Sequence, residues 1–231
     1  MDYYALTGKN GILLDFDGTI CLLFKNYNLQ NTVTELCDCM RKLCISYSST
    51  QDSFEVFEEI IRQTENDNLL RSKALREANR IITNAEIEAI HTCEPVRGAI
   101  EVLDFLLEKR MPLGISTNNS VRCVECFFEK YLPGKTIPIV GRVAECLHLM
   151  KPNPWSINEV CKRLMILPQQ ALYIGDTKRD YEAARNAGCL FWGMGTTERK
   201  WNRLLSFSPA DSIVNDFFTL RDRLILSNIF H

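Results

Sequence analysis

The chain has 231 residues, of which 46% are hydrophobic and 24% charged, a composition typical of a soluble globular protein. The 27 Lys and Arg residues against 29 Asp and Glu residues give a formal charge of -2 without a basic block, which argues against nucleic acid as a partner. Residues 1–10 lack the features of a secretory signal, and Asp15 and Asp17 interrupt the apolar stretch 11–24, so we expect a cytoplasmic protein with reduced cysteines and no membrane span.

The first predicted element is a buried strand over residues 11–16, because an apolar run of this length followed by Gly18 is too short for a helix. From about residue 29 to 92 the apolar residues recur with helical spacing. We predict helices over 32–43, 52–64 and 69–79, and another after Thr83. Thr83 and Glu86, three residues apart, resemble a capping box at the start of that last helix.

After Pro95 short apolar runs alternate with amphipathic stretches. We predict strands over 113–117, 137–140, 171–174 and 189–194, helices over 99–109, 120–129, 155–164 and 180–186, and a weaker strand and helix within 212–224. This alternation predicts an α/β fold with a doubly wound, Rossmann-like parallel sheet. We therefore expect a catalytic core formed by residues 1–24 and 95–231, and an inserted all-helical domain over residues 25–94.

Polar residues follow several of the predicted strands. The first strand ends in Asp15 and Asp17, the next ends in Thr117 and Asn118, and a later one ends in the segment that contains Asp176 and Asp180, while Lys151 precedes a helix. In an open parallel sheet ligands bind at the carboxyl ends of the strands, so we expect these side chains to meet there.

Carboxylates gathered at one edge of a sheet repel one another unless a cation lies between them. Mg²⁺ prefers carboxylate and carbonyl oxygens and is commonly held together with a substrate phosphate. The Lys151 ammonium can offset phosphate charge, and Thr117 and Asn118 can bind phosphoryl oxygens. This pattern predicts a Mg²⁺-dependent site for a small phosphorylated metabolite.

Asp15 would attack phosphorus and form an aspartyl-phosphate. Asp17, two residues later, would protonate the leaving oxygen and then take a proton from the attacking water. An ordinary aspartate, with a pKa of about 3.9, is a poor acid at neutral pH, so this role requires surroundings that raise the pKa.

Four segments resemble the motifs of the haloacid dehalogenase superfamily, which consists mostly of phosphatases. They are Asp15-Phe-Asp-Gly-Thr19, Ile115-Ser-Thr-Asn118, Lys151-Pro152 and Gly175-Asp-Thr-Lys-Arg-Asp180, and the continuation over 181–188 is similar to the phosphoglycolate phosphatase-like branch. The resemblance implies Mg²⁺ held by the carboxylates of Asp15 and Asp176 and the backbone carbonyl of Asp17, supported by Asp180. It also implies that the helical insertion is a cap that selects the substrate.

Two features leave the substrate open. The segment 20–24 is apolar, whereas phosphoglycolate phosphatases usually have polar residues after the first motif, so phosphoglycolate itself is not singled out. In the cap, Arg71, Lys73, Arg76 and Arg80 form either a carboxylate-binding group or a solvated basic face, and Arg142 in the core raises the same question.

Two other functions compete with a phosphatase. A phosphomutase similar to beta-phosphoglucomutase would form the same aspartyl-phosphate but return the phosphoryl group to its substrate. A non-catalytic binding module would keep the fold, although such modules usually lose the nucleophile or a metal carboxylate. We expect a monomer or a homodimer.

Overall fold

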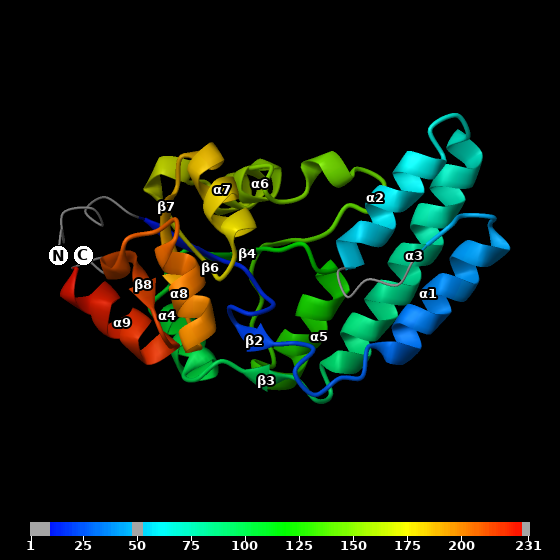
Figure 1. Cartoon of the computed structure of the whole chain (residues 1–231). Coiled ribbons are helices and arrows are strands. Elements are labelled where there is room, and N and C mark those ends of the chain that lie inside the picture. The colour runs from blue at the N-terminus through cyan, green and yellow to red at the C-terminus, as the bar shows by residue number, and fades with distance from the viewer. Residues whose placement is uncertain (1–9, 48–52, 228–231) are drawn as a thin grey trace.

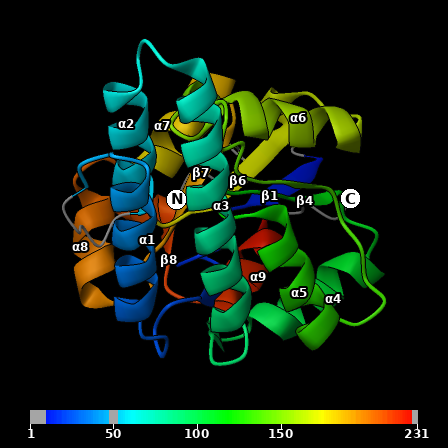
Figure 2. The same cartoon turned by 90° about the vertical axis from the view of Figure 1, so that its right-hand side faces the viewer.

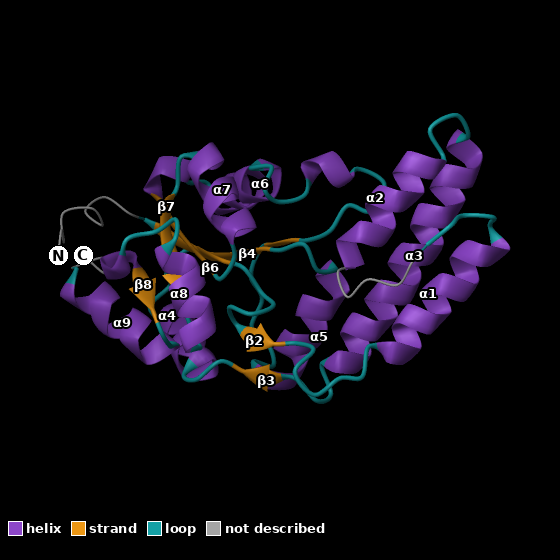
Figure 3. Cartoon of the chain, viewed as in Figure 1, coloured by secondary structure: helices purple, strands orange, loops and turns teal. Residues whose placement is uncertain are grey.

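The computed structural model describes residues 10–47 and 53–227. Within these ranges six parallel strands form one sheet in the order β5-β4-β1-β6-β7-β8. Figure 3 shows the strands in orange and the helices around them in purple. In chain order the strands are β1 (Gly11–Leu14), β4 (Leu113–Ser116), β5 (Ile139–Val140), β6 (Ala171–Gly175), β7 (Leu190–Met194) and β8 (Ile213–Val214). The predicted α/β fold with a doubly wound parallel sheet is confirmed.

Helices cover both faces of the sheet because neighbouring strand residues point to opposite sides. Ile12 and Leu14 pack into one core with α4 (Ala99–Glu108), α5 (Val121–Tyr131) and α9 (Phe217–Leu226). Leu13 packs into a second core with α6 (Trp155–Leu164), α7 (Lys178–Ala187) and α8 (Glu198–Leu205). Figure 2 shows α6 and α7 on one side of the sheet and α4, α5 and α9 on the other.

Three further helices stand beside the sheet and share a hydrophobic cluster of their own (Figure 1). They are α1 (Gln30–Lys42), α2 (Ser53–Gln63) and α3 (Asn68–Ala89). The chain enters and leaves this unit through β2 (Cys21–Leu22) and β3 (Glu94–Pro95), which pair antiparallel. No helix in the described ranges is both long enough and apolar enough to cross a bilayer.

The predicted break between helices near residue 80 is wrong, because α3 continues from residue 68 to 89. No glycine or proline lies between Asn79 and Thr83, and the side chains of Ile81 and Ile82 are buried, so packing favours a continuous helix. Thr83 and Glu86 do not form a capping box. Both side chains instead bind Arg142 of the sheet domain.

The Glu86–Arg142 ion pair joins α3 to the loops that follow β4 and β5. Arg142 Nη1 lies 2.7 Å from Glu86 Oε1, and the two side chains are only 3% and 2% exposed. Arg142 Nε also donates to Asn79 Oδ1 at 2.8 Å. Glu86 accepts hydrogen bonds from Asn119 Nδ2 at 3.1 Å and from the Ser120 backbone amide at 3.0 Å. We call this set the α3 clasp.

Several short elements were not predicted. They are β2, β3, α8 and the 3-10 turns Leu147–Leu149, Pro168–Gln170 and Ala210–Ser212. Two-residue strands have no sequence periodicity of their own, since they depend on a partner distant in the chain. Helix α8 has only eight residues, and its single buried anchor, Leu204, left too weak an apolar pattern to identify it.

The α3 clasp gives a first prediction. Replacing Arg142 by Met should destabilise the fold by about 3–5 kcal/mol, because the Glu86 carboxylate would remain buried without its cation. Urea unfolding followed by circular dichroism measures the loss. Arg122→Met is the control, since Arg122 pairs with Glu129 on the surface of α5. Similar losses in the two variants would show that the clasp does not carry the expected energy.

Candidate active site

Asp15, Thr117 and Asp176 each follow directly after the end of one of three neighbouring strands. Strand β1 lies between β4 and β6, with Leu14 paired to Ile115 on one side and to Ile174 on the other. Asp15 therefore emerges directly beside the ends of both neighbours, and its backbone amide donates to Ile174 O at 2.8 Å. The fold brings the first, second and fourth motifs to one edge because their strands are adjacent and parallel.

Lys151 reaches this edge from the loop before α6 and lies at the centre of a buried polar network. Its Nζ donates to Asp15 Oδ1 at 2.6 Å and to Asp180 Oδ1 at 2.5 Å. It also contacts Ser116 O at 3.1 Å and the Tyr173 hydroxyl at 2.9 Å. Burial lowers the pKa of Lys151, but the carboxylates of Asp15 and Asp180 outweigh this effect and raise it well above its ordinary value. The ammonium therefore remains charged.

Asp180 supports Lys151. Its Oδ2 accepts from the Thr177 backbone amide at 3.0 Å and from the Thr177 hydroxyl at 2.5 Å, while its Oδ1 accepts from Lys151 and from Tyr173. Burial alone would raise the pKa of Asp180, but Lys151 and the hydrogen bonds from Thr177 hold it below its ordinary value. Both oxygens already have protein donors, which fits the expected supporting position.

The pKa values of Asp15, Asp17 and Asp176 are raised, in contrast to that of Asp180. Burial raises the pKa of Asp15 to about 7, although Lys151 opposes the shift. Burial also raises the pKa of Asp17 to about 6, and that of Asp176 to about 6 against the nearby Lys200. The site thus gathers more carboxyls than the two lysines can neutralise, and additional protons or a bound cation would relieve the excess.

The side chain of Asp17 is held by the start of the linker to the helical unit. Its Oδ1 accepts a hydrogen bond from the Leu23 backbone amide at 2.9 Å. Between them the chain turns at Gly18, which has a φ of 89°, and the Gly18 amide donates to Cys21 O at 2.6 Å. Asp17 therefore lies directly before this turn, and its pKa of about 6 is closer to neutral pH than that of an ordinary aspartate.

Asp15, Asp176 and Asp180 form a buried triad that could bind a metal ion, since each offers one oxygen within 4.8 Å of the others. Asp176 Oδ1 is buried and has no hydrogen-bond partner in the described part of the chain. Such an orphaned oxygen fits a metal ligand. A Cβ on Gly18 would collide with the Asp176 carboxylate, so glycine is required beside it.

Thr117 and Asn118 are close to the other motifs but already have protein partners. The Thr117 hydroxyl donates to Asn119 Oδ1 at 3.0 Å, and its side chain is buried. The Asn118 side chain accepts from the Lys151 backbone amide at 3.1 Å and donates to Lys151 O at 3.3 Å. In this arrangement Asn118 fixes the backbone that carries the lysine.

A cavity of about 720 Å³ opens above the strand ends. Its walls come from both the sheet domain and the helical unit, and its lining residues are Asp15, Asp17, Phe24, Glu86, Asn118, Asn119, Arg142, Lys151, Thr177, Arg179, Asp180, Arg199 and Arg203. Of the predicted site residues, Thr117 and Asp176 are not among those that line the cavity. Arg142 does line the cavity, but Glu86 neutralises it.

None of the basic residues of the helical unit that the sequence singled out lines this cavity. Arg71 donates to Thr64 O at 2.8 Å, and Arg80 pairs with Glu77 and Glu35. Lys73 and Arg80 border a separate groove between α1 and α3. The interpretation as a solvated basic face therefore fits these residues better than the carboxylate-binding one.

Sequence reasoning missed two groups that complete the site. Tyr173 is fully buried in β6, and its hydroxyl donates to Ser116 O at 2.9 Å beneath Lys151. Lys200 of α8 reaches Asp176 Oδ2 at 2.6 Å and Gly18 O at 3.0 Å. Tyr173 occupies an ordinary core position of an apolar strand, and recognition of α8 was needed before Lys200 could be considered.

Comparisons with known proteins agree with this geometry. A family model described as haloacid dehalogenase-like hydrolase matches residues 12–194. The phosphoglycolate phosphatase of Haemophilus influenzae is 30% identical over 129 residues, which cover 52% of this chain and 53% of that protein. The phosphoglycolate phosphatase of Escherichia coli is 31% identical over 119 residues, covering 50% and 46% respectively. The chain thus spans about half the length of the curated relatives it matches.

A solved structure shares the fold over nearly the whole chain. The HAD hydrolase from Entamoeba histolytica superposes with a TM-score of 0.66 at 17% identity, covering 94% of this chain and 99% of that one. At this level of identity the likeness concerns the arrangement of helices and strands.

The raised pKa values predict how stability depends on pH in the presence of a chelator. The folded protein binds protons at Asp15, Asp17 and Asp176 more tightly than the unfolded chain, in which their pKa is near 3.8. This contribution is complete below pH 3.8 and is lost as the pH rises through 6 to 7. The free energy of unfolding should therefore fall between about pH 4 and pH 7.

Asp17→Asn removes one of these titrating groups. A shift from 3.8 to about 6 corresponds to at most about 3 kcal/mol, so the decline between pH 4 and pH 7 should become smaller by up to that amount. The lowered pKa of Asp180 acts only near pH 3.8 and below, outside this range. Urea unfolding at several pH values provides the measurement, and an unchanged decline in the variant would contradict the assignment.

Proposed function

Because the chain belongs to the haloacid dehalogenase-like hydrolase family, we propose that it is a Mg²⁺-dependent phosphatase that hydrolyses a small phosphate monoester through Asp15. One observation carries the proposal: Asp15, Asp17 and Lys151 line the same cavity at the carboxyl ends of the central strands. The names of the phosphoglycolate phosphatases that it resembles support a small phosphorylated substrate.

In the first step Asp15 would attack phosphorus. Lys151 holds Oδ1 of this carboxylate at 2.6 Å, whereas Oδ2 meets only the Thr19 hydroxyl, at 3.5 Å, among the described residues. Oδ2 is therefore the nucleophile. As the bond between Oδ2 and phosphorus forms, the bond from phosphorus to the leaving oxygen breaks, and Asp17 gives that oxygen its proton.

In the second step water would release the phosphate. Asp17, now ionised, takes a proton from the water, which attacks phosphorus and breaks its bond to Asp15. A pKa of about 6 allows the same carboxyl to donate in one step and accept in the next at neutral pH. Lys151, Thr117 and Asn118 are the groups that we assign to the phosphoryl oxygens, once the side chains of Thr117 and Asn118 exchange their present partners for substrate.

The residues present fit a magnesium ion. Asp15 and Asp176 offer carboxylate oxygens, including the unpartnered Asp176 Oδ1, and we assign the backbone carbonyl of Asp17 as a third ligand. Asp180 supports the site through Lys151. When bound, the ion would offset the charge of the phosphoryl group.

We assign residues 25–94 as a cap over the site. The cavity is open to solvent, so water can enter it for the second step. A mutase would interconvert isomers without net release of phosphate. The non-catalytic alternative is disfavoured because the nucleophile, the lysine and the metal carboxylates are all present.

Asp15→Asn should lower phosphate release from p-nitrophenyl phosphate to the background rate, because the amide cannot act as the nucleophile. The release of p-nitrophenol measures the loss, and the circular dichroism spectrum checks the fold. Asp222→Asn, at an exposed position on α9, serves as the control and should retain wild-type turnover. Normal turnover by the Asp15 variant would rule the mechanism out.

Removing divalent ions with a chelator should abolish turnover, and adding Mg²⁺ should restore it. Mg²⁺ should also raise the melting temperature, since a ligand at a hundred times its dissociation constant stabilises the folded state by about 2.7 kcal/mol. Asp176→Asn should lose most of this thermal shift, whereas Asp222→Asn should keep it. Full activity in the chelator, or an undiminished shift in Asp176→Asn, would contradict the metal assignment.

A further inference from the structure

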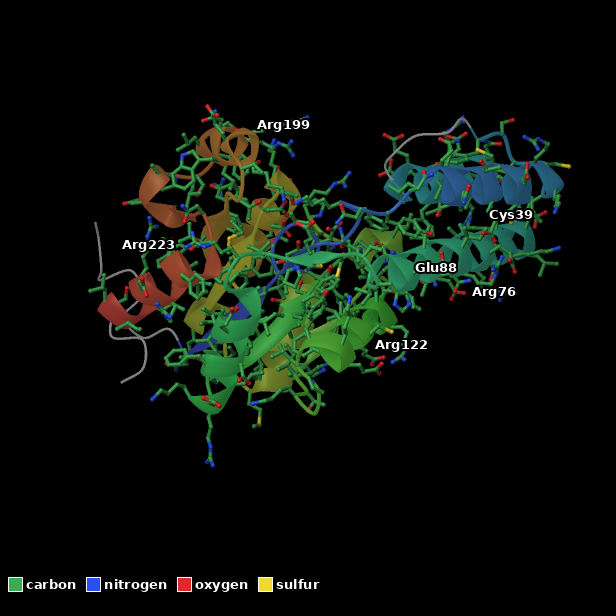
Figure 4. All side chains as sticks on the ribbon, turned by 90° about the horizontal axis from the view of Figure 1, so that it is seen from below. Cys39, Arg76, Glu88, Arg122, Arg199 and Arg223 are labelled. Carbon is green, nitrogen blue, oxygen red and sulfur yellow. The ribbon has the colours of Figure 1, made fainter. Side chains whose placement is uncertain are left out.

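Helix α8 places basic residues at the wall of the active-site cavity. Arg199 and Arg203 both line the cavity that contains Asp15 and Lys151. Because they are four residues apart, their side chains leave the same face of the helix. Figure 4 shows Arg199 on the side of α8 that faces the cap helices. These two residues are named here the α8 arginines.

The active site itself holds α8 in place. Thr197 caps the helix by accepting a hydrogen bond from the Lys200 backbone amide at 3.2 Å, and Leu204 is fully buried against the sheet. Lys200 then joins the helix to Asp176 Oδ2 at 2.6 Å. The α8 arginines flank Lys200 in the sequence, so the contact with Asp176 also fixes their position at the cavity wall.

Both α8 arginines are exposed, and neither guanidinium group forms a hydrogen bond or ion pair with a residue in the described part of the chain. Two other cations of the cavity are already neutralised, Arg142 by Glu86 and Lys151 by Asp15 and Asp180. Arg179 on α7 lines the same cavity. The α8 arginines thus remain available to a ligand.

The helical unit does not supply this charge. Among the described residues of the range 25–94, Glu86 alone lines the cavity, and it is acidic. Its basic residues Lys73 and Arg80 border the groove between α1 and α3 instead. A negatively charged group of a substrate would therefore meet its cations on the sheet domain.

We propose that the α8 arginines bind a second anionic group of the substrate, a carboxylate or a second phosphate. This inference rests on the proposed function and deepens it: the substrate class is a small phosphate monoester with a second anion. A guanidinium forms paired hydrogen bonds with either kind of group. A cavity of about 720 Å³ is large enough for a small phosphate ester together with its second anionic group.

Matched esters test the proposal. 2-Phosphoglycolate is compared with 2-hydroxyethyl phosphate, and 1,4-butanediol bisphosphate with 4-hydroxybutyl phosphate, so that each pair differs in the second anion. The wild-type protein should prefer the anionic member of at least one pair by about ten- to a hundredfold in kcat/KM. The pair that shows the preference distinguishes a carboxylate from a second phosphate.

The double variant Arg199→Ala/Arg203→Ala should lose this preference, mainly through KM, and Arg199→Lys/Arg203→Lys should restore part of it because the charge remains. Lys73→Ala/Arg76→Ala removes two cap charges away from the cavity and should keep the preference. Equal kcat/KM values within both pairs for the wild-type protein, or a preference that survives in Arg199→Ala/Arg203→Ala, would overturn the proposal.

Calorimetric binding of the same esters to Asp15→Asn separates this inference from the proposed function. Tighter binding of the anionic member, lost when Arg199→Ala/Arg203→Ala is added, supports the second-anion site even if the wild-type protein hydrolyses none of the esters. That combination would reject only the phosphatase. Binding without preference, or no binding of either member, would reject the second-anion site.

Discussion

The buried ammonium of Lys151 is the interaction on which the site depends. It lies between Asp15 and Asp180, which come from the ends of β1 and the start of α7, and it contacts the end of β4 through Ser116 O. Without this cation two carboxylates would be buried next to each other. One side chain thus joins three segments of the sheet edge and leaves Asp15 Oδ2 with only the Thr19 hydroxyl as a hydrogen-bond partner among the described residues.

The sequence predicted the alternation of strands and helices and the residues that follow the strand ends. The alternation after Pro95 was enough for the parallel sheet, and the position of Asp15, Thr117 and Asp176 after their strands placed them at one edge. The predictions that were wrong concern residues whose partners are distant in the sequence. Thr83 and Glu86 satisfy a local capping pattern, but their real partner, Arg142, lies 56 residues beyond Glu86. Local spacing contains no information about that ion pair.

The site shows the same division. The motif residues could be assigned from the sequence, but the surroundings that make them useful could not. Asp17 needs burial and the Leu23 amide, Asp180 needs Lys151, and Asp176 meets Lys200 from a helix that the pattern did not reveal. The available positive charge also lies on the sheet domain, whereas the sequence directed attention to the helical insertion.

The α3 clasp has a consequence for how the molecule could open. It attaches the end of α3 nearest the sheet to Asn119 and Ser120, immediately after the second motif. If α1, α2 and α3 moved away from the sheet as one body, Arg142 would lose its ion pair with Glu86. A rotation about this anchored end leaves the pair intact and moves the distant ends of α1, α2 and α3 the most (Figure 1). Substrate entry would then displace the distant ends of the three helices, while the loop beside Thr117 keeps its position.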